Sequence, residues 1–314
     1  AYLERTMLHG DLHARWYGPL RGVASALGIG LRPSLAIGAP MSTGSDPLGA
    51  DAALTAGVLG TALEMLEAEA REAGAKAVVW PFLPEHATVA HDVARSRGYV
   101  ESFANSEAVL DVEWRTSDEY VASRSKSVRR TLRQELAWVA EHGIQVTWEE
   151  NLGPLAGALD ALYRASYASR NGRAAALPPN LFAELGAQQS NGVRVQCARR
   201  GDELLEMAIA LDAGGALDLC LSAQSDETRN GTLYQHCLCF DPVRDASARG
   251  ISRIHLGPSA LYPKVLRGAR LERRVTLVRG CTPGARAAIR VAAPVLAARN
   301  EAKQRWQLAA LPAE

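Results

Sequence analysis

"VRVQCARRGDELLEMAIALDAGGALDLCLSAQ", residues 193–224, decides the fold of the second half of this chain. It contains three runs that are rich in apolar residues, at 193–200, 205–214 and 216–224. The short connections between them, "RRGDE" and "DAGGA", carry glycine and aspartate, which favour tight hairpin turns. Because hairpins join antiparallel neighbours, the stretch predicts a three-stranded antiparallel meander.

The segments on either side extend this meander into a sheet flanked by helices. In chain order we expect a basic helix (117–143), a strand (144–150), two helices (155–170 and 177–189), the meander, a helix (231–250), a strand (251–257), a last strand (270–280) and a C-terminal helix. Ser117 is a good N-cap for the basic helix, and Gly143 a good C-terminal stop. This order of elements is an α+β pattern.

The first half has a shorter alternation of the same kinds of element. We expect helices at 13–28, 50–74 and 84–98, strands at 31–40, 75–83 and 106–114, and a glycine-rich loop, "PMSTGSDPLGA", at 40–50. The loop lacks the spacing of a phosphate-binding Walker loop, so we interpret it as a connection or as part of a cleft.

Composition excludes several classes of protein. With 35 Lys and Arg against 34 Asp and Glu, the net charge of +1 predicts no general affinity for polyanions, so any nucleic-acid contact needs a local basic surface. There is no apolar run long enough for a membrane span. The five cysteines are irregularly spaced, which fits a reducing cytoplasm, and Cys237 and Cys239 are interpreted as buried small residues.

Four stretches resemble one protein family: "SKSVRRTLRQE" (125–135), "LYRASYASR…LPPNLFAEL" (162–185), "GTLYQHCLCFDPVRDASARGISRIHLG" (231–257) and "YPKVLRGA" (262–269). In this order they are similar to the FemABX-like aminoacyltransferases and the related peptidoglycan-biosynthesis/recognition proteins of the GNAT superfamily. The resemblance covers about residues 115–275, and the first half only by architecture.

The resemblance implies tandem GNAT-like domains, with mixed sheets flanked by helices around a central cleft. We expect a degenerate N-terminal domain at 1–115 and a C-terminal domain with a C-terminal helix at 116–314. It also implies an amide-forming enzyme that moves an aminoacyl group from aminoacyl-tRNA, its co-substrate, directly to the amine of a small molecule or cell-wall precursor. No further cofactor is implied.

Lys264 is the first candidate catalytic residue. It follows a predicted strand in a turn bounded by Pro258 and Pro263. Acyl transfer passes through a tetrahedral oxyanion, and a fixed cation beside that oxygen is a large catalytic contribution. The family's "K-x-x-x-G" motif falls on the same residue. The alternative is an ordinary surface lysine.

A basic helical face is the candidate donor site. Lys126, Arg129, Arg130 and Arg133 are spaced three and four apart, so they share one side of a helix. Guanidinium groups pair well with phosphates, which favours RNA or another phosphate-bearing donor over a merely solvated surface. Arg229 is added to this set because it lies where CoA-dependent GNAT proteins bind pyrophosphate.

The pyrophosphate segment departs from the usual pattern. The expected loop, Q/R-x-x-G-x-G/A, is replaced by "SDETRNGTLYQ", which keeps Gly231 but lacks the second glycine. Acyl-CoA, or an acyl-carrier-protein thioester, is therefore the alternative donor rather than the favoured one. A non-catalytic binding protein is a third hypothesis.

The remaining candidates are polar and aromatic side chains. Tyr234 and Asp218 are predicted catalytic residues, Asp218 as one of three candidate bases with Asp111 and His236. Tyr163, Tyr167, Trp80 and Ser42 are predicted to bind substrate. His9 and His13 have no third ligand in reach, so we predict no metal site. The oligomeric state is left open.

Overall fold

The structure is a computed structural model that describes residues 2–4, 33–38, 56–175, 177–187, 192–213, 215–228 and 231–309. The predicted helix 13–28, the glycine-rich loop 40–50, and the candidate residues Ser42 and Arg229 lie outside the described residues. The same is true of His9 and His13.

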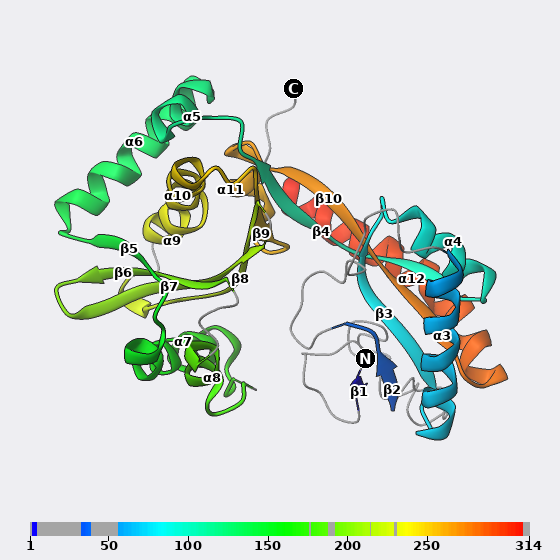
Figure 1. The fold of residues 1–314 in the computed structure, drawn as a ribbon. Helices are drawn as coiled ribbons and strands as arrows, with labels where there is room; N and C mark the ends of the chain where they lie inside the picture. The colour runs from blue at the N-terminus through cyan, green and yellow to red at the C-terminus, as the bar shows by residue number, and fades with distance from the viewer. Residues whose placement is uncertain are drawn as a thin grey trace. The chain divides into compact units, whose positions relative to one another are not determined.

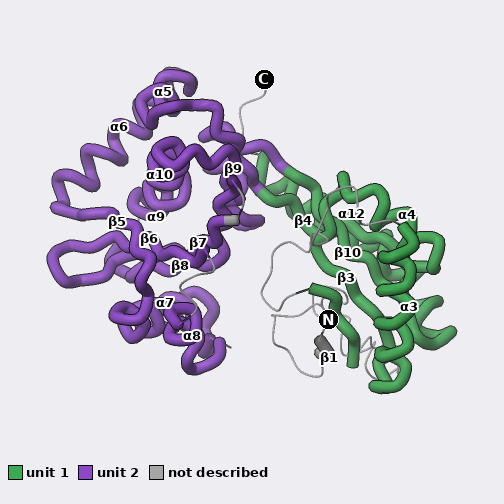
Figure 2. Tube along the Cα trace, in the orientation of Figure 1, with its two compact units in different colours: residues 1–107, 272–312 green, residues 108–271, 313–314 purple. Residues whose placement is uncertain are grey.

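The chain forms two compact units (Figure 2). Unit 1 comprises residues 1–107 and 272–312, and unit 2 comprises residues 108–271 and 313–314. The chain therefore crosses between the units at 107/108 and returns at 271/272, whereas the predicted domains 1–115 and 116–314 allow a single crossing.

Unit 1 contains a mixed sheet covered by helices on both faces. Its strands follow the order β1 (Tyr2–Glu4), β2 (Ser34–Ala36), β3 (Ala77–Pro84), β10 (Arg270–Gly280) and β4 (Val100–Asp111), of which β4 and β10 run on into unit 2. Its helices are α3 (Ala56–Glu72), α4 (Thr88–Ser96) and α12 (Pro283–Leu308). β10 pairs antiparallel with β3, so a C-terminal strand completes a sheet begun at the N-terminus.

The apolar run of β3 explains why it lies in the middle of this sheet. Val78 and Trp80 pack with α3 and α4, whereas Ala77 and Val79, which point to the other face, pack with α12. A strand that is buried on both faces needs a continuous apolar sequence rather than an alternating one. "AVVWPFL" satisfies that requirement.

Unit 2 contains the predicted meander. Its strands are β5 (Gln145–Glu149), β6 (Val193–Arg200), β7 (Glu203–Ala213), β8 (Ala216–Gln224) and β9 (Arg253–Gly257), joined by the end of β4. The four strands β5 to β8 pair antiparallel in sequence, whereas β8 and β9 are parallel. The prediction of an antiparallel meander followed by a helix and a strand is confirmed.

Helices cover both faces of the unit 2 sheet (Figure 1). They are α5 (Ser117–Ser123), α6 (Lys126–Glu141), α7 (Ala156–Asn171), α8 (Leu181–Ala187), α9 (Thr232–Gln235), a π-helix η5 (His236–Phe240), α10 (Asp241–Arg249) and α11 (Leu261–Leu266), with 3-10 turns η2 (Gly153–Leu155) and η4 (Asp226–Thr228). Helices α7 and α8 pack on one face and α6, α9 and η5 on the other.

The predicted basic helix 117–143 is two helices, α5 and α6. Arg124 between them is extended, and Ser125 caps α6 by accepting a hydrogen bond from the Val128 N–H (3.5 Å). Thr116, not Ser117, is the N-cap of α5. Hydroxyl residues that can cap a helix occur both at 116–117 and at 125. The apolar periodicity alone therefore does not show that the helix is interrupted between α5 and α6.

A buried carboxylate ties α3 to its neighbours in unit 1. Glu67 is 4% exposed and accepts hydrogen bonds from Arg97 Nε (3.0 Å) and Nη2 (2.8 Å), and it also forms an ion pair with Arg279. Burial raises the pKa of Glu67, but the hydrogen bonds and charges of Arg97 and Arg279 outweigh it. The pKa therefore lies below its ordinary value.

Glu67→Gln is expected to lower the free energy of unfolding at pH 7 by about 2 kcal/mol, because two guanidinium groups lose their carboxylate. Since the folded-state pKa is depressed, this contribution exists above the ordinary glutamate pKa and is lost as pH falls through the folded value. Urea unfolding at pH 7 and below about pH 4 should show the difference narrowing in acid. Glu69→Gln, an exposed change on the same helix, is the control, and a difference that does not vary with pH would contradict the prediction.

Candidate active site

Strands β8 and β9 pair for three residues and then separate. The parallel ladder joins Ala216 to Arg253, Leu217 to Ile254 and Asp218 to His255. Beyond it, β8 continues to Gln224 beside β7, while β9 continues to Gly257 beside β4. Asp218 therefore belongs to the last pair before the strands part. The carboxyl ends of separating parallel strands are where open α/β sheets bind ligands.

Lys264 lies at this end of β9, on helix α11. Its side chain is 1% exposed, and Nζ donates hydrogen bonds to the carbonyl oxygens of Leu256 (2.5 Å) and Gly257 (3.4 Å). A surface location, the alternative left open by the sequence, is therefore wrong. Ala260, just before α11, adopts a left-handed conformation (φ 48°), which is unfavourable for alanine and occurs most often near functional sites.

Arg267 fixes the segment that carries Lys264 to helices α5 and α6. It is 6% exposed and forms an ion pair with Glu135, which is 5% exposed on α6. Its carbonyl oxygen accepts hydrogen bonds from the Tyr120 hydroxyl (3.0 Å) and from Arg124 Nη1 (3.2 Å). This ion pair and these hydrogen bonds hold α11 against two other helices.

Tyr234 on α9 lies at the same edge of the sheet. Burial raises the pKa of its hydroxyl to about 12, although a hydrogen bond with Ser259 of the β9–α11 segment opposes the shift. The phenol therefore stays neutral near pH 7 and keeps a proton to donate. The structure thus brings Tyr234, Lys264 and Asp218 to the region where β8 and β9 separate.

Glu206 is a buried carboxylate that we did not predict. It is 0% exposed on β7, and neither of its oxygens has a hydrogen-bond partner among the residues that the structure describes. The available signal was a single charge inside the apolar run "LEMAIAL", at a position where an unpaired charge is costly. Burial raises the pKa of Glu206 to about 8, with Arg170 opposing.

The predicted aromatic substrate residues belong to hydrophobic cores. Tyr163 is 7% exposed and packs on Tyr167 and Phe182, on the sheet face opposite Tyr234. Trp80 is 4% exposed in the core of unit 1. Their burial is explained by packing, and their role in substrate binding stays a prediction.

The other two candidate bases are occupied differently. Asp111 forms ion pairs with Arg270 and Arg253, whose hydrogen bonds lower its pKa against the effect of burial. His236 lies in the π-helix, and burial lowers its pKa to about 4, so the imidazole is neutral near pH 7.

The basic residues of α6 divide into two groups. Lys126, Arg130 and Arg133 are exposed on the side of the helix opposite buried Leu132, and none of them forms an ion pair within the described residues. Arg129 instead donates from Nη1 to the carbonyl oxygens of Ala122 (3.2 Å) and Arg124 (2.8 Å) and so caps α5. We call the three exposed cations the α6 basic face.

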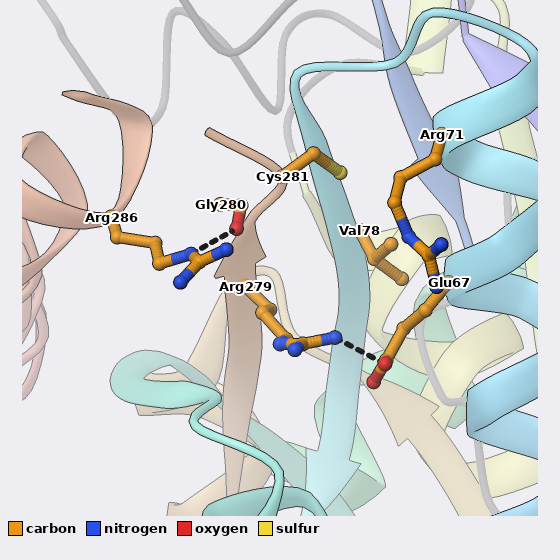
Figure 3. A pocket seen from close by; sticks show the side chains of 7 residues that line it. All are labelled: Glu67, Arg71, Val78, Arg279, Gly280, Cys281 and Arg286. Atoms are coloured by element: carbon orange, nitrogen blue, oxygen red, sulfur yellow. Dashed lines mark hydrogen bonds and ion pairs between the residues drawn. The ribbon is translucent and has the colours of Figure 1, made fainter. Parts of the chain in front are cut away.

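A small cavity lies in unit 1 between α3, β3, β10 and the start of α12 (Figure 3). Its volume is about 30 Å³, room for one or two waters. Arg279 and Glu67 pair across it, and Arg286 Nε donates to the Gly280 carbonyl oxygen (3.1 Å). Arg71 also lines the cavity, so its wall carries three arginines and one glutamate.

In the described part of the chain, no three His, Cys, Asp or Glu side chains converge as metal ligands do. Cys237 and Cys239 are buried, as predicted. Each helix within the described ranges is too short or too polar to cross a bilayer.

Comparison with known proteins identifies the fold. Residues 126–264 match the family model described as an acetyltransferase (GNAT) domain. No curated protein matches the sequence.

Three solved structures share the architecture over most of their length. The C-terminal domain of a putative lysylphosphatidylglycerol synthetase from Agrobacterium fabrum has a TM-score of 0.55 and 17% identity, covering 76% of this chain and 78% of that one. L-PGS from Bacillus licheniformis gives 0.54 and 11%, covering 74% and 78%. FemX gives 0.52 and 12%, covering 78% and 79%. The domain match and these structures together identify the chain as having the GNAT fold, in the form shared with FemX.

Proposed function

We propose that this protein is an amide-forming acyltransferase. It moves an aminoacyl group from aminoacyl-tRNA to the amine of a small molecule or cell-wall precursor. The observation that carries the proposal is the buried Lys264 ammonium at the end of β9, where β8 and β9 separate in a GNAT fold.

The location of Lys264 suits stabilisation of an oxyanion. When an amine attacks an ester carbonyl, the carbonyl oxygen gains a full negative charge. A cation that is already buried and oriented needs little reorganisation to meet that charge, and it acts through a medium of low dielectric constant. The carbonyl oxygens of Leu256 and Gly257 hold the ammonium in place.

Direct transfer requires two proton movements. The acceptor nitrogen forms the C–N bond and loses a proton, while the ester C–O bond breaks and the ribose oxygen gains one. We assign Asp218 as the acceptor of the first proton and the neutral Tyr234 hydroxyl as the donor of the second. No acyl-enzyme intermediate is needed.

The α6 basic face supports a polyanionic donor. Lys126, Arg130 and Arg133 project from one side of the helix, and no carboxylate in the described residues neutralises them. Unpaired arginines on one helical face contact successive backbone phosphates, which fits an RNA whose shape, not sequence, is recognised. One similar structure is the C-terminal domain of a putative lysylphosphatidylglycerol synthetase, a name that refers to a lysyl group on a phospholipid, which supports an aminoacyl unit.

Acyl-CoA, or an acyl-carrier-protein thioester, is the second candidate donor. The match of residues 126–264 to an acetyltransferase domain favours it. The two donors differ in that only one of them contains RNA.

Reversal of the α6 basic face (Lys126→Glu, Arg130→Glu, Arg133→Glu) is expected to remove tRNA that co-purifies with the native protein. If three phosphate contacts are lost, the slope of log affinity against log salt falls by about two to three. The measurement is sequencing of bound RNA together with binding at several salt concentrations. Arg129 is left unchanged because it caps α5.

The matched control reverses three exposed cations of α12 (Arg290→Glu, Lys303→Glu, Arg305→Glu), with the same change in net charge. It should retain the RNA. If the native protein carries no RNA but binds CoA or a carrier protein, or if both triple variants lose RNA equally, the tRNA proposal is wrong.

Lys264→Met is expected to slow transfer about 10²- to 10³-fold, the cost of one oxyanion donor. It should also lower the free energy of unfolding by about 1–3 kcal/mol, because two buried carbonyl oxygens lose their donor. Single-turnover loss of a labelled aminoacyl group from the co-purified tRNA, with amines supplied by a small-molecule extract, measures the rate. Lys264→Arg keeps the charge, and Lys303→Met controls for loss of a lysine. A folded Lys264→Met variant with the native rate would refute the role.

A further inference from the structure

Glu206 has no donor in a place where a buried carboxylate requires one. Its side chain is 0% exposed, and both oxygens lack a hydrogen-bond partner. The residue is therefore either protonated and unsatisfied, or it awaits a donor from outside the described residues. Natural proteins retain few such groups, and those retained usually have a function.

The register of β7 fixes the direction of this side chain. Glu206 lies opposite Ala198 of β6 and Gln224 of β8, and cross-strand partners share a face of the sheet. Ala198 packs with Leu233 of α9 and Cys237 of η5. Glu206 thus points into the layer between the sheet and α9–η5, which Figure 1 shows on one side of β6 to β8.

The same layer has another acceptor without a donor among the described residues. Gln196, two residues from Ala198 along β6, is 1% exposed, and its Oε1 also has no partner. The charged group whose field reaches Glu206 is Arg170 of α7, but Arg170 donates its hydrogen bonds to Ser166 Oγ (3.2 and 2.6 Å). Tyr234 of α9 and Cys237 of η5 are the titratable groups that sense the Glu206 charge from the helical side.

Glu206 also lies at the edge of the sheet that contains the candidate active site. It is opposite Gln224, the last residue of β8, and the parallel strand β9 ends at this edge as well. The charge of Glu206 contributes to the raised pKa of Tyr234. The Tyr234 hydroxyl is also hydrogen-bonded to Ser259, on the segment that leads to Lys264. Tyr234 therefore connects Glu206 with the segment that carries Lys264.

We propose that Glu206 binds the free α-ammonium of the transferred aminoacyl unit. This inference rests on the proposed function, since a plain acyl group has no cation to offer. An ammonium provides three N–H donors and a positive charge, which matches a layer with surplus acceptors. Within the described residues no three His, Cys, Asp or Glu side chains converge as metal ligands do, which favours an organic cation over a metal ion.

Ammonium binding at Glu206 can be recognised by the release of a proton. Because the pKa of Glu206 is raised to about 8, most of the carboxyl is protonated at pH 7. Binding of an ammonium favours the carboxylate and so releases about one proton. The raised pKa also means that stability falls as pH rises from the unfolded glutamate value to the folded one. Glu206→Gln is therefore expected to raise the melting temperature at pH 8–9.

The test compares L-alaninamide, which carries an ammonium, with N-acetyl-L-alaninamide, which does not. Calorimetry at pH 7 in two buffers of different ionisation enthalpy measures affinity and proton release together. We expect the native protein to bind the cationic amide with release of about one proton, and the acetylated amide at least about tenfold more weakly. Glu206→Gln should lose this preference while melting higher, and Glu203→Gln, an exposed change on the same strand, should keep it.

Equal affinity of the native protein for both amides, or no binding of either at millimolar concentration, would overturn the inference. So would an unchanged preference in Glu206→Gln, the result expected if Glu206 holds only a buried water. The comparison of two probes on the native protein does not depend on any variant folding. Co-purification of RNA is measured separately from this comparison. If the protein binds tRNA but shows no preference for the cationic amide, the Glu206 site is rejected and the proposed function is not.

Discussion

The parting of β8 and β9 after three residue pairs is the constraint on which the candidate site depends. In parallel strands that stay paired, the backbone N–H and C=O groups of one strand form hydrogen bonds with those of the other. Once they separate, the groups at the end of β9 need other partners, because an unsatisfied buried carbonyl is costly. Lys264 supplies hydrogen bonds to Leu256 and Gly257, and this demand for a donor holds a lysine in the interior. The buried cation thus follows from the shape of the sheet.

That arrangement needs support from elements distant in sequence. Arg267 and Glu135 are 132 residues apart and form a buried ion pair that ties the segment after Lys264 to α6. Replacing such a pair by apolar residues often leaves stability unchanged, so its value lies in fixing one geometry. Ala260, just before α11, has a strained left-handed backbone (φ 48°). Both features favour preorganisation of Lys264 over a mobile lysine on a loop.

The local part of this structure could be predicted from sequence, and the long-range part could not. Glycines in "RRGDE" and "DAGGA" and the apolar periodicity determine the β6–β7–β8 meander, because hairpins are set by neighbouring residues. The partner of "RLERRVTLVRG" is not local, so nothing in that run shows that β10 joins β3 in unit 1. For the site, the turn around Lys264 was informative, whereas Tyr163 and Trp80 are aromatic residues whose burial is explained by packing. Arg129 has the spacing of a phosphate ligand but caps α5, since helical spacing cannot distinguish a cap from a ligand.

Lys264 and Glu206 are two buried ionisable residues, and the raised pKa of Glu206 (about 8) leaves its carboxyl mostly protonated near pH 7 until a cation binds. Glu206 has no hydrogen-bond partner in the described part of the chain, and Lys264 donates hydrogen bonds to backbone carbonyl oxygens. If the site served only stability, joining the two would relieve both desolvation costs. Keeping them apart suits a ligand that is itself dipolar. The tetrahedral intermediate of an aminoacyl ester is such a ligand, with an oxyanion on one carbon and an ammonium on the next. A lysine beside the oxyanion and a carboxylate beside the ammonium would distinguish this intermediate from that of a plain acyl group, which carries the oxyanion alone. Under the proposed function, Lys264 and Glu206 would therefore each meet one charge of an aminoacyl intermediate, whichever way the RNA is bound.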